Sequence, residues 1–185
     1  MSTVPVPAPR ATIEDGGNSV RVSVPARRNV VAILFIVAWL CAWFFGEKTA
    51  VVQLLAPRTS GVNGFLGFWL VGWSLGGVFA ARAVLWMLFG RETIELRDSE
   101  LVLRRTTLGL GRTRSYDLGA IKTLRAEPST RPMGRSSFEF AGGVGGAIAF
   151  DYGPKTIRCG GALDESEARQ IVDLFKQRNA HLRSA

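Results

Sequence analysis

The chain has 185 residues, of which 47% are hydrophobic and 21% charged, and its formal net charge is +8. This length leaves room for one domain plus an appendage, and the two cysteines, Cys41 and Cys159, are too few and too distant for a disulfide framework or a CxxC zinc site. The positive charge is spread thinly, without the dense basic tract of nucleic-acid binders, so no nucleic-acid partner is expected. Attraction to anionic lipid headgroups explains such a charge more simply.

The first 26 residues are rich in proline and glycine. A segment of this composition has little apolar surface to bury, so it predicts an extended or disordered tail over residues 1–26. The residues that carry this prediction are Pro5, Pro7, Pro9, Gly16, Gly17 and Pro25.

Two apolar runs follow this tail. The first covers residues 29–46 without a charge, and its stretch 30–45 measures roughly 24 Å as a helix, short for a hydrocarbon core of about 30 Å. The second covers residues 65–90 with Arg82 as its one charge, and 65–89 is long enough to span with tilt. We expect a transmembrane helical hairpin over residues 27–90. The alternative is a hairpin buried in a soluble protein, which the length of the second run disfavours.

Basic residues flank this pair of runs on the outer sides. Arg27 and Arg28 precede the first run and Arg91 follows the second, whereas the segment between them holds only Lys48 and Arg58. The positive-inside rule therefore predicts a multi-pass membrane protein with both termini in the cytoplasm. The first run ends in bulky aromatic residues and lacks an A-x-A-like site, so we do not expect it to be a cleaved signal peptide.

The apolar runs offer two kinds of contact. Arg82 lies in the last third of the second run, where it either snorkels to the interface or contacts a headgroup or a partner subunit. Small residues recur at spacing four in both runs, which lets helices approach closely in lipid. Either the two helices pack on each other or one stripe docks on a partner subunit. The stripes are Ala38, Ala42 and Gly46 in the first run and Gly72, Gly76 and Ala80 in the second.

From residue 91 the apolar periodicity changes to two, which is typical of strands. The pattern predicts an antiparallel meander of about seven short strands. These are residues 93–97, 101–105, 112–118, 120–127, 138–142, 147–152 and 155–160.

A C-terminal helix is expected over residues 164–180. Asp164 suits its N-cap and Glu167 stands three residues on, a capping-box variant. One apolar face can close the open end of a small barrel. That face consists of Ala168, Ile171, Val172 and Phe175.

Seven strands and a closing helix resemble the pleckstrin-homology-like fold. The segment "AIAFDYGPKTIRCGGALDESEARQIV", preceded by a two-helix anchor, is similar to small bacterial two-helix membrane proteins with a pleckstrin-homology-like cytoplasmic domain. The resemblance covers residues 27–180 and departs at Cys159, where a large aromatic is expected. It implies a membrane α+β protein with a transmembrane helical hairpin and a small antiparallel seven-stranded barrel over residues 91–185. It also implies location in the bacterial cytoplasmic (inner) membrane, and an adaptor or membrane-associated module rather than a catalyst.

Few features of the chain suggest chemistry. His181 lies in the last five residues, so a frayed-tail position is expected. The glycines over 142–146 lack the GxGxxG spacing and predict a flexible connection. No GxSxG, HExxH or Walker motif occurs, and the apolar runs hold no histidine to ligate haem. We therefore predict no catalytic, cofactor-binding or metal residue, no cofactor and no small-molecule substrate.

The stretch "IAFDYGPKTIRCG" raises the question of an active site. Its apolar residues alternate on both sides of a Gly-Pro turn, so it is predicted to be a hairpin with Cys159 as a small buried hydrophobe. An enzyme would require the polar residues Asp151, Tyr152 and Lys155 to act together.

The turn "LGLG" at residues 108–111 is the best candidate contact surface. If it faces the bilayer, arginines would meet lipid phosphates while leucines insert. The alternative is an ordinary solvated strand edge blunted by charge. The residues concerned are Arg104, Arg105, Leu108, Leu110, Arg112 and Arg114.

These observations favour a non-catalytic accessory or scaffolding subunit of a larger bacterial membrane complex, for example photosynthetic or respiratory. Two helices would anchor it among other membrane subunits, and its domain would cover the cytoplasmic side. The alternative is a stand-alone membrane-anchored PH-like module that binds anionic lipid headgroups or a cytoplasmic partner. An enzyme is not expected.

Overall fold

The computed structural model describes residues 11–55, 60–127 and 146–184. The chain forms two compact units. The sheet unit combines the residues up to Arg27 with those from Phe89 onward, and the helical unit is Arg28–Leu88. The helical unit is thus inserted, in sequence, within the sheet unit.

The helical unit consists of α1 (Val30–Leu55) and α2 (Ser60–Phe89), and both are long and apolar enough to cross a membrane. The Asn29 side chain accepts a hydrogen bond from the Ala32 N–H (3.1 Å), which satisfies a free amide in the first turn of α1. Helix α1 continues ten residues beyond the predicted 30–45, because no glycine or proline interrupts residues 47–55. Helix α2 likewise begins at 60 rather than 65.

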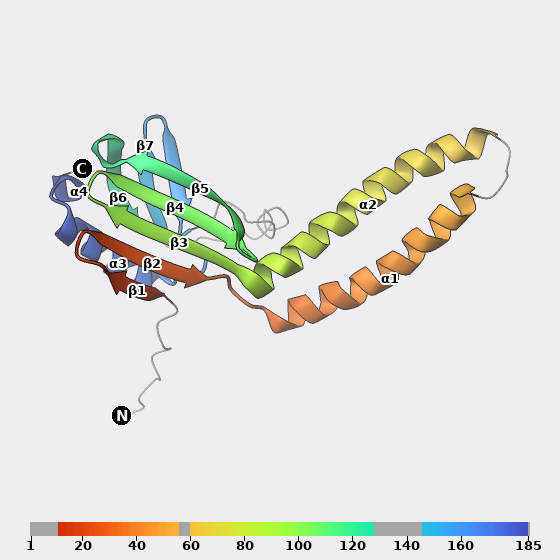
Figure 1. Cartoon of the computed structure of the whole chain (residues 1–185), viewed down its shortest axis with the longest axis horizontal. Helices are drawn as coiled ribbons and strands as arrows, with labels where there is room; N and C mark the ends of the chain where they lie inside the picture. Colours follow the sequence, from red (N-terminus) through yellow and green to blue (C-terminus); the bar gives the residue numbers. More distant parts are fainter. Residues whose placement is uncertain (1–10, 56–59, 128–145, 185) are drawn as a thin grey trace, which may run out of the picture. The chain divides into compact units, whose positions relative to one another are not determined.

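The sheet unit contains two antiparallel sheets (Figure 1). One has five strands in the order β1-β2-β3-β4-β5, and the other has three in the order β6-β7-β8. The strands are β1 (Thr12–Asp15), β2 (Ser19–Pro25), β3 (Gly90–Arg97), β4 (Glu100–Thr107), β5 (Leu110–Asp117), β6 (Ile121–Ala126), β7 (Ile148–Tyr152) and β8 (Lys155–Cys159).

One hydrophobic core joins both sheets and the C-terminal helix α3 (Glu165–Arg178). Helix α3 packs against β6 and β7, and Phe150 and Phe175 are among the largest fully buried side chains. In β3 the residues alternate between buried and more exposed positions, so Ile94 and Leu96 point into the core. Burying each of these side chains contributes about 2 kcal/mol.

The start of α3 confirms the predicted capping box. Asp164 Oδ1 accepts the Glu167 N–H (2.8 Å), and Glu167 Oε2 accepts the Asp164 N–H (3.2 Å). The predicted apolar face is buried as well. Its members are Ala168, Ile171, Val172 and Phe175.

The predicted seven-stranded barrel is wrong. In the part of the chain that the structure describes, the strands form separate sheets of five and three, and neither closes. The single 3₁₀ turn Leu118–Ala120 separates β5 from β6, and their ladders run to β4 and β7 instead of to each other. Six of the predicted strands are present, and the one expected at 138–142 lies outside the described residues.

The two additional strands come from the segment predicted to be an extended or disordered tail. Strand β2 pairs with β3, with Val22 opposite Ile94. Its alternating side chains Val20, Val22 and Val24 are at most 3% exposed, so this segment is part of the core. Residues 1–10 of the predicted tail lie outside the described residues.

Candidate functional site

One end of the five-stranded sheet is where the chain enters and leaves the helical unit. The Ala26 N–H donates to the Gly90 carbonyl (2.9 Å), so the last residue of the N-terminal segment is tied to the first residue of β3. Gly90 is also the cross-strand partner of Thr107, the last residue of β4. The β4–β5 turn therefore lies at the same end of the sheet. We call Leu108, Gly109 and Leu110 the β4–β5 tip.

The β4–β5 tip combines a strained backbone with exposed apolar side chains. Leu108 has φ 53° and Gly109 has φ 81°, as a two-residue type I′ turn requires. Asn and Gly are favoured in such turns, because a left-handed conformation brings Cβ close to the following carbonyl and costs about 1–2 kcal/mol. Leu108 is nevertheless 61% exposed and Leu110 82% exposed. Among the described residues of the sheet unit, nothing explains a leucine at this position.

Gly111 fixes how β5 leaves the tip. A Cβ at Gly111 would lie 2.1 Å from the Arg105 carbonyl oxygen, a distance that real atoms do not reach. Only glycine therefore allows β5 to cross β4 this closely, and the shape of the tip depends on it.

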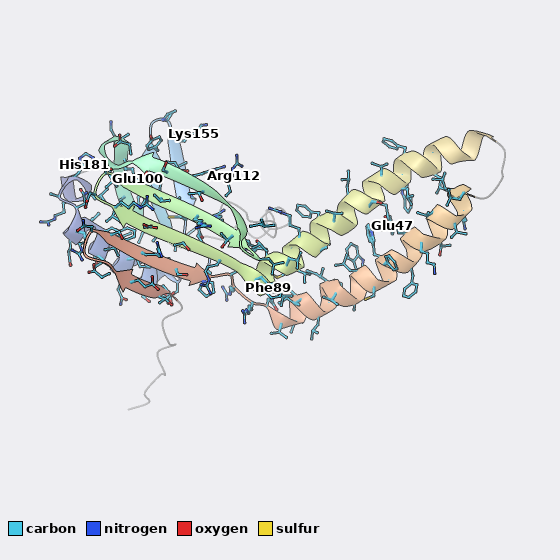
Figure 2. All side chains as sticks on the ribbon, viewed as in Figure 1. Glu47, Phe89, Glu100, Arg112, Lys155 and His181 are labelled. Carbon is cyan, nitrogen blue, oxygen red and sulfur yellow. The ribbon has the colours of Figure 1, made fainter. Side chains whose placement is uncertain are left out.

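The four arginines around the tip do not form one cluster. The register puts Arg105 and Arg112 opposite each other, and Arg114 follows two residues on along the same face of the sheet. Arg104 lies on the other face, opposite Thr93 and Thr113. Arg104, Arg112 and Arg114 are exposed and form no ion pair within the described residues. Figure 2 shows Arg112 at one end of the five-stranded sheet and Glu100 at the other.

Arg105 has a different role from the other three arginines. Its Nε donates to Oε1 of Glu92 (3.0 Å), the residue directly opposite on β3. Glu92 is 6% exposed, and its Oε2 accepts the N–H groups of Gly160 (3.1 Å) and Gly161 (3.3 Å). The carboxylate therefore links the five-stranded sheet to the connection between β8 and α3, and a buried charge of this kind is stable because it is paired.

Cys159 lies beside this carboxylate at the end of β8. It is fully buried, as the alternation of its strand predicts. Burial raises the pKa of the Cys159 thiol, and the Glu92 carboxylate raises it further against the opposing effect of Arg105. The thiol is therefore a core group rather than a nucleophile.

Asp151, the first of the polar residues that an enzyme would require, is part of an ion-pair network on the three-stranded sheet. Asp151 accepts Thr156 Oγ1 (2.6 Å) and Arg125 Nη1 (3.0 Å). Arg125 also pairs with Glu127, which pairs in turn with Arg158. The Thr156 and Arg125 hydrogen bonds hold the pKa of Asp151 below its usual value. Such a carboxylate is ionised and its charge is balanced by Arg125, so it is a poor general base.

The other members of that group do not join Asp151. Tyr152 packs edge-on against Tyr116 at 5.2 Å between ring centroids. Lys155 is exposed at the start of β8, next to the β7–β8 turn (Figure 2). His181 begins the short helix α4 (His181–Ser184), and among the described residues no group of three acidic, histidine or cysteine side chains could hold a metal. Of the glycines at 142–146, only Gly146 belongs to the described residues.

Four tryptophan rings lie together between the two helices of the helical unit, and we call them the tryptophan stack. The Trp43 and Trp73 rings are stacked at 3.8 Å and 18°, and Trp39 and Trp69 lie against them as tilted rings at 4.3 and 4.4 Å. Glu47 accepts a hydrogen bond from Ser74 of the opposite helix. Aromatic stacking and one polar pair therefore join α1 to α2.

The predicted small-residue stripes divide between two situations. Gly46 and Gly76 lie against tryptophans of the opposite helix, since a Cβ at these positions would lie 3.8 and 3.3 Å from the nearest ring atom. A Cβ at Gly72 would meet nothing within 4 Å, and Ala38 and Ala42 are exposed. The stripes thus receive tryptophan rings at some positions and stay open at others. Ala80 is partly buried and Arg82 is exposed.

No family model matches the sequence, and no curated protein is significantly similar to it.

The sequence did not lead us to predict Glu92 or the tryptophan stack, although a pattern in the sequence marks each of them. Glu92 stands in phase with the core residues Ile94 and Leu96, which marks a buried acid. The tryptophans occur in pairs at spacing four in each helix, which places each pair on one helix face.

Proposed function

We propose that the protein is a non-catalytic accessory or scaffolding subunit of a larger bacterial membrane complex. The helices would span the inner membrane, and the sheet unit would cover the cytoplasmic side together with both termini. The observation that supports this best is the Ala26–Gly90 hydrogen bond, because both ends of the helical unit lead directly into neighbouring strands of one sheet. A chain tied in this way keeps its sheet unit at the membrane face, as a scaffold requires.

The charged groups of the sheet unit favour a structural role over catalysis. Glu92 is committed to Arg105 and two backbone amides, and Asp151 to Thr156 and Arg125. A general base needs a carboxylate or imidazole that can take up a proton from substrate. Carboxylates held in this way stabilise the sheets instead.

The open positions of the helical unit support a partner within the membrane. Gly72, Ala38 and Ala42 take no part in the tryptophan stack. Small residues that are not used between the two helices leave room for a third helix to approach closely. A partner subunit that supplies such a helix fits the proposed role.

Native extraction tests this proposal. The chain, expressed in its own host and extracted in a mild detergent, should elute in an assembly well above its own 20.1 kDa, as measured by light scattering and native mass spectrometry. Gly72→Leu should reduce the yield of that assembly, since the larger side chain fills the open position. Val71→Leu, on a neighbouring exposed residue, serves as the matched control. Elution of the wild-type chain as a lone monomer would contradict the proposal.

A stand-alone membrane-anchored PH-like module that binds anionic lipid or a cytoplasmic partner is the second candidate. The exposed Arg104, Arg112 and Arg114 favour it, because guanidinium groups bind phosphate well. In this case the purified monomer would be the functional form. Changing these three arginines to glutamine in the full chain should then weaken its affinity for anionic over zwitterionic nanodiscs.

A further inference from the structure

We propose that the β4–β5 tip is a membrane-insertion element, which enters the headgroup layer of the anionic bilayer that the chain's own helices cross. This inference rests on the membrane anchorage in the proposed function. It does not require a partner subunit. It adds a third point of membrane contact to the two helices.

The strand register brings the tip close to the residue at which the chain leaves α2. Phe89 ends α2, and the next residue, Gly90, is paired with Thr107 across about 5 Å. If α2 spans the bilayer, its end lies near the interface, where a basic flanking residue such as Arg91 is typical. The tip begins one residue after Thr107. It is therefore only a few ångströms along the sheet from a residue that is covalently bound to the membrane span.

The tip has the chemistry of an inserting element. Leu108 and Leu110 expose most of their side chains, and Leu108 does so from a left-handed conformation that disfavours it. A solvated turn of this type would be more stable with Asn at the Leu108 position. Apolar side chains become favourable there only if they leave water, which the acyl boundary of a bilayer allows.

The charges around the tip select an anionic surface. Arg112 and Arg114 lie on one face of the sheet and Arg104 on the other, so positive groups stand on both sides of the leucines. Arginines placed in this way can bind lipid phosphates while the leucines between them penetrate. The register keeps the tip within a few residues of the end of α2, which favours the bilayer that α2 would cross over a protein pocket elsewhere. The bilayer is therefore the occupant that we infer.

Fluorescent labelling of single cysteines in nanodiscs with about 30% anionic lipid tests the inference. Native Cys41 is exposed and lies roughly 16 Å into α1, near the bilayer centre if α1 spans. Leu108→Cys and Ser99→Cys are made in a Cys41→Ala background, and buried Cys159 stays unlabelled. Ser99 is the matched control, because it is exposed in the β3–β4 turn at the opposite end of the sheet.

A label at Leu108→Cys should be quenched severalfold more strongly by nitroxide lipids than a label at Ser99→Cys, and severalfold less by aqueous iodide. The inference is overturned if both labels behave alike while the Cys41 label is quenched by lipid, and membrane anchorage then stands. If the Cys41 label is not quenched either, the anchorage and the inference fall together. Protection from iodide without lipid quenching would show that a protein covers the tip, which also overturns it.

A second set of variants separates lipid charge from fold. Arg112→Gln should reduce lipid quenching of the Leu108→Cys label in anionic nanodiscs, as should neutral lipid. Lys155→Gln removes the same charge from an exposed residue of the other sheet and should leave quenching unchanged. Leu108→Asn, labelled at Leu110→Cys, should lose quenching relative to Leu110→Cys alone, while the thermal unfolding midpoint does not fall. Insertion would be contradicted if lipid quenching stayed the same after Arg112→Gln, after Leu108→Asn and after replacement of anionic by neutral lipid.

Discussion

Glu92 and Arg105 face each other across β3 and β4, and their Oε1 and Nε atoms lie 3.0 Å apart beside the fully buried Cys159. The second carboxylate oxygen of Glu92 holds the amides of Gly160 and Gly161. One side chain thus fixes both a cross-strand pair and the junction between the two sheets. The consequences for stability depend on which partner is removed.

Arg105→Gln should lower the free energy of unfolding by about 2–3 kcal/mol, because it leaves a buried carboxylate without its cation. Glu92→Gln added to Arg105→Gln should recover part of that loss, since the neutral amide can still accept the glycine amides. Amide hydrogen exchange at Gly160 and Gly161 gives the local measurement, and circular dichroism gives the global one. Tryptophan fluorescence would not serve, because all five tryptophans lie in α1 and α2.

Equal stability of the two variants would contradict this account, because the charge of Glu92 would then not be the source of the loss. Arg104→Gln is the control for both. Arg104 is exposed on the opposite face of the same strand, so a change below about 0.5 kcal/mol is expected.

Leu108→Asn should raise the stability of the sheet unit by about 0.5–1 kcal/mol, because asparagine tolerates the left-handed conformation at φ 53°. Thermal unfolding in detergent, followed by circular dichroism, measures the gain. Leu110→Asn has no such strain to relieve, since Leu110 starts β5. A gain of equal size at Leu110 would point to the loss of exposed apolar surface instead.

Gly77→Ala should disturb the tryptophan stack, whereas Gly72→Ala should not. A Cβ at Gly77 would lie 3.0 Å from Nε1 of Trp43, closer than normal contact, but a Cβ at Gly72 meets nothing within 4 Å. Both substitutions gain about 0.8–1 kcal/mol of helix propensity, which therefore cancels in the comparison. The near-ultraviolet circular dichroism of the stacked indoles is the readout. The expectation fails if both variants keep the wild-type spectrum.

Acid should destabilise the sheet unit through Asp151. Its hydrogen bonds from Thr156 and Arg125 lower its pKa in the folded state, so its contribution is fully present above the unfolded value of about 3.9. The contribution is lost as the pH falls from there through the lower folded pKa. Asp151→Asn should therefore flatten the fall of the unfolding midpoint below about pH 4. Thr156→Val, which removes the first of these hydrogen bonds, should flatten it partly. If Asp151→Asn and the wild-type chain show the same unfolding midpoints at every pH, this role of Asp151 is excluded.

Local patterns predicted most of the elements correctly. The apolar runs predicted both helices, the period of two predicted the antiparallel strands from residue 93 onward, and Asp164 with Glu167 predicted the start of α3. Each of these signals involves residues close in sequence, because helix caps and strand alternation are local properties.

The pairing of distant segments could not be predicted in this way. Val20, Val22 and Val24 alternate as a strand should, but the surrounding prolines and glycines favoured a tail, and the partner strand begins only at Gly90. The closed barrel failed for a related reason. Alternation predicts that a strand has a buried face, but it does not say to which neighbour each edge is bonded, so β5 and β6 could not be separated from the sequence.

The structure distinguishes residues around the candidate site that the sequence could not tell apart. The sequence drew attention to the turn at Leu108 and its arginines, yet it treated the four arginines as equivalent. Arg105 differs because it lies in phase with Leu101 and Leu103, opposite an acid that is likewise in phase with the core. Only the register of β3 against β4 reveals that pair, and only a backbone angle reveals the strain at Leu108.

The position of the helices between β2 and β3 has a consequence for synthesis of the chain. Strand β2 leaves the ribosome before α1 and α2, yet its partner β3 follows only after both helices have been made. If the two helices span the bilayer as proposed, the valines of β2 reach their core only when the second helix returns the chain to the side on which it started. Completion of the sheet would then act as a check on membrane topology, because a chain with a single crossing would leave β2 and β3 on opposite sides of the bilayer.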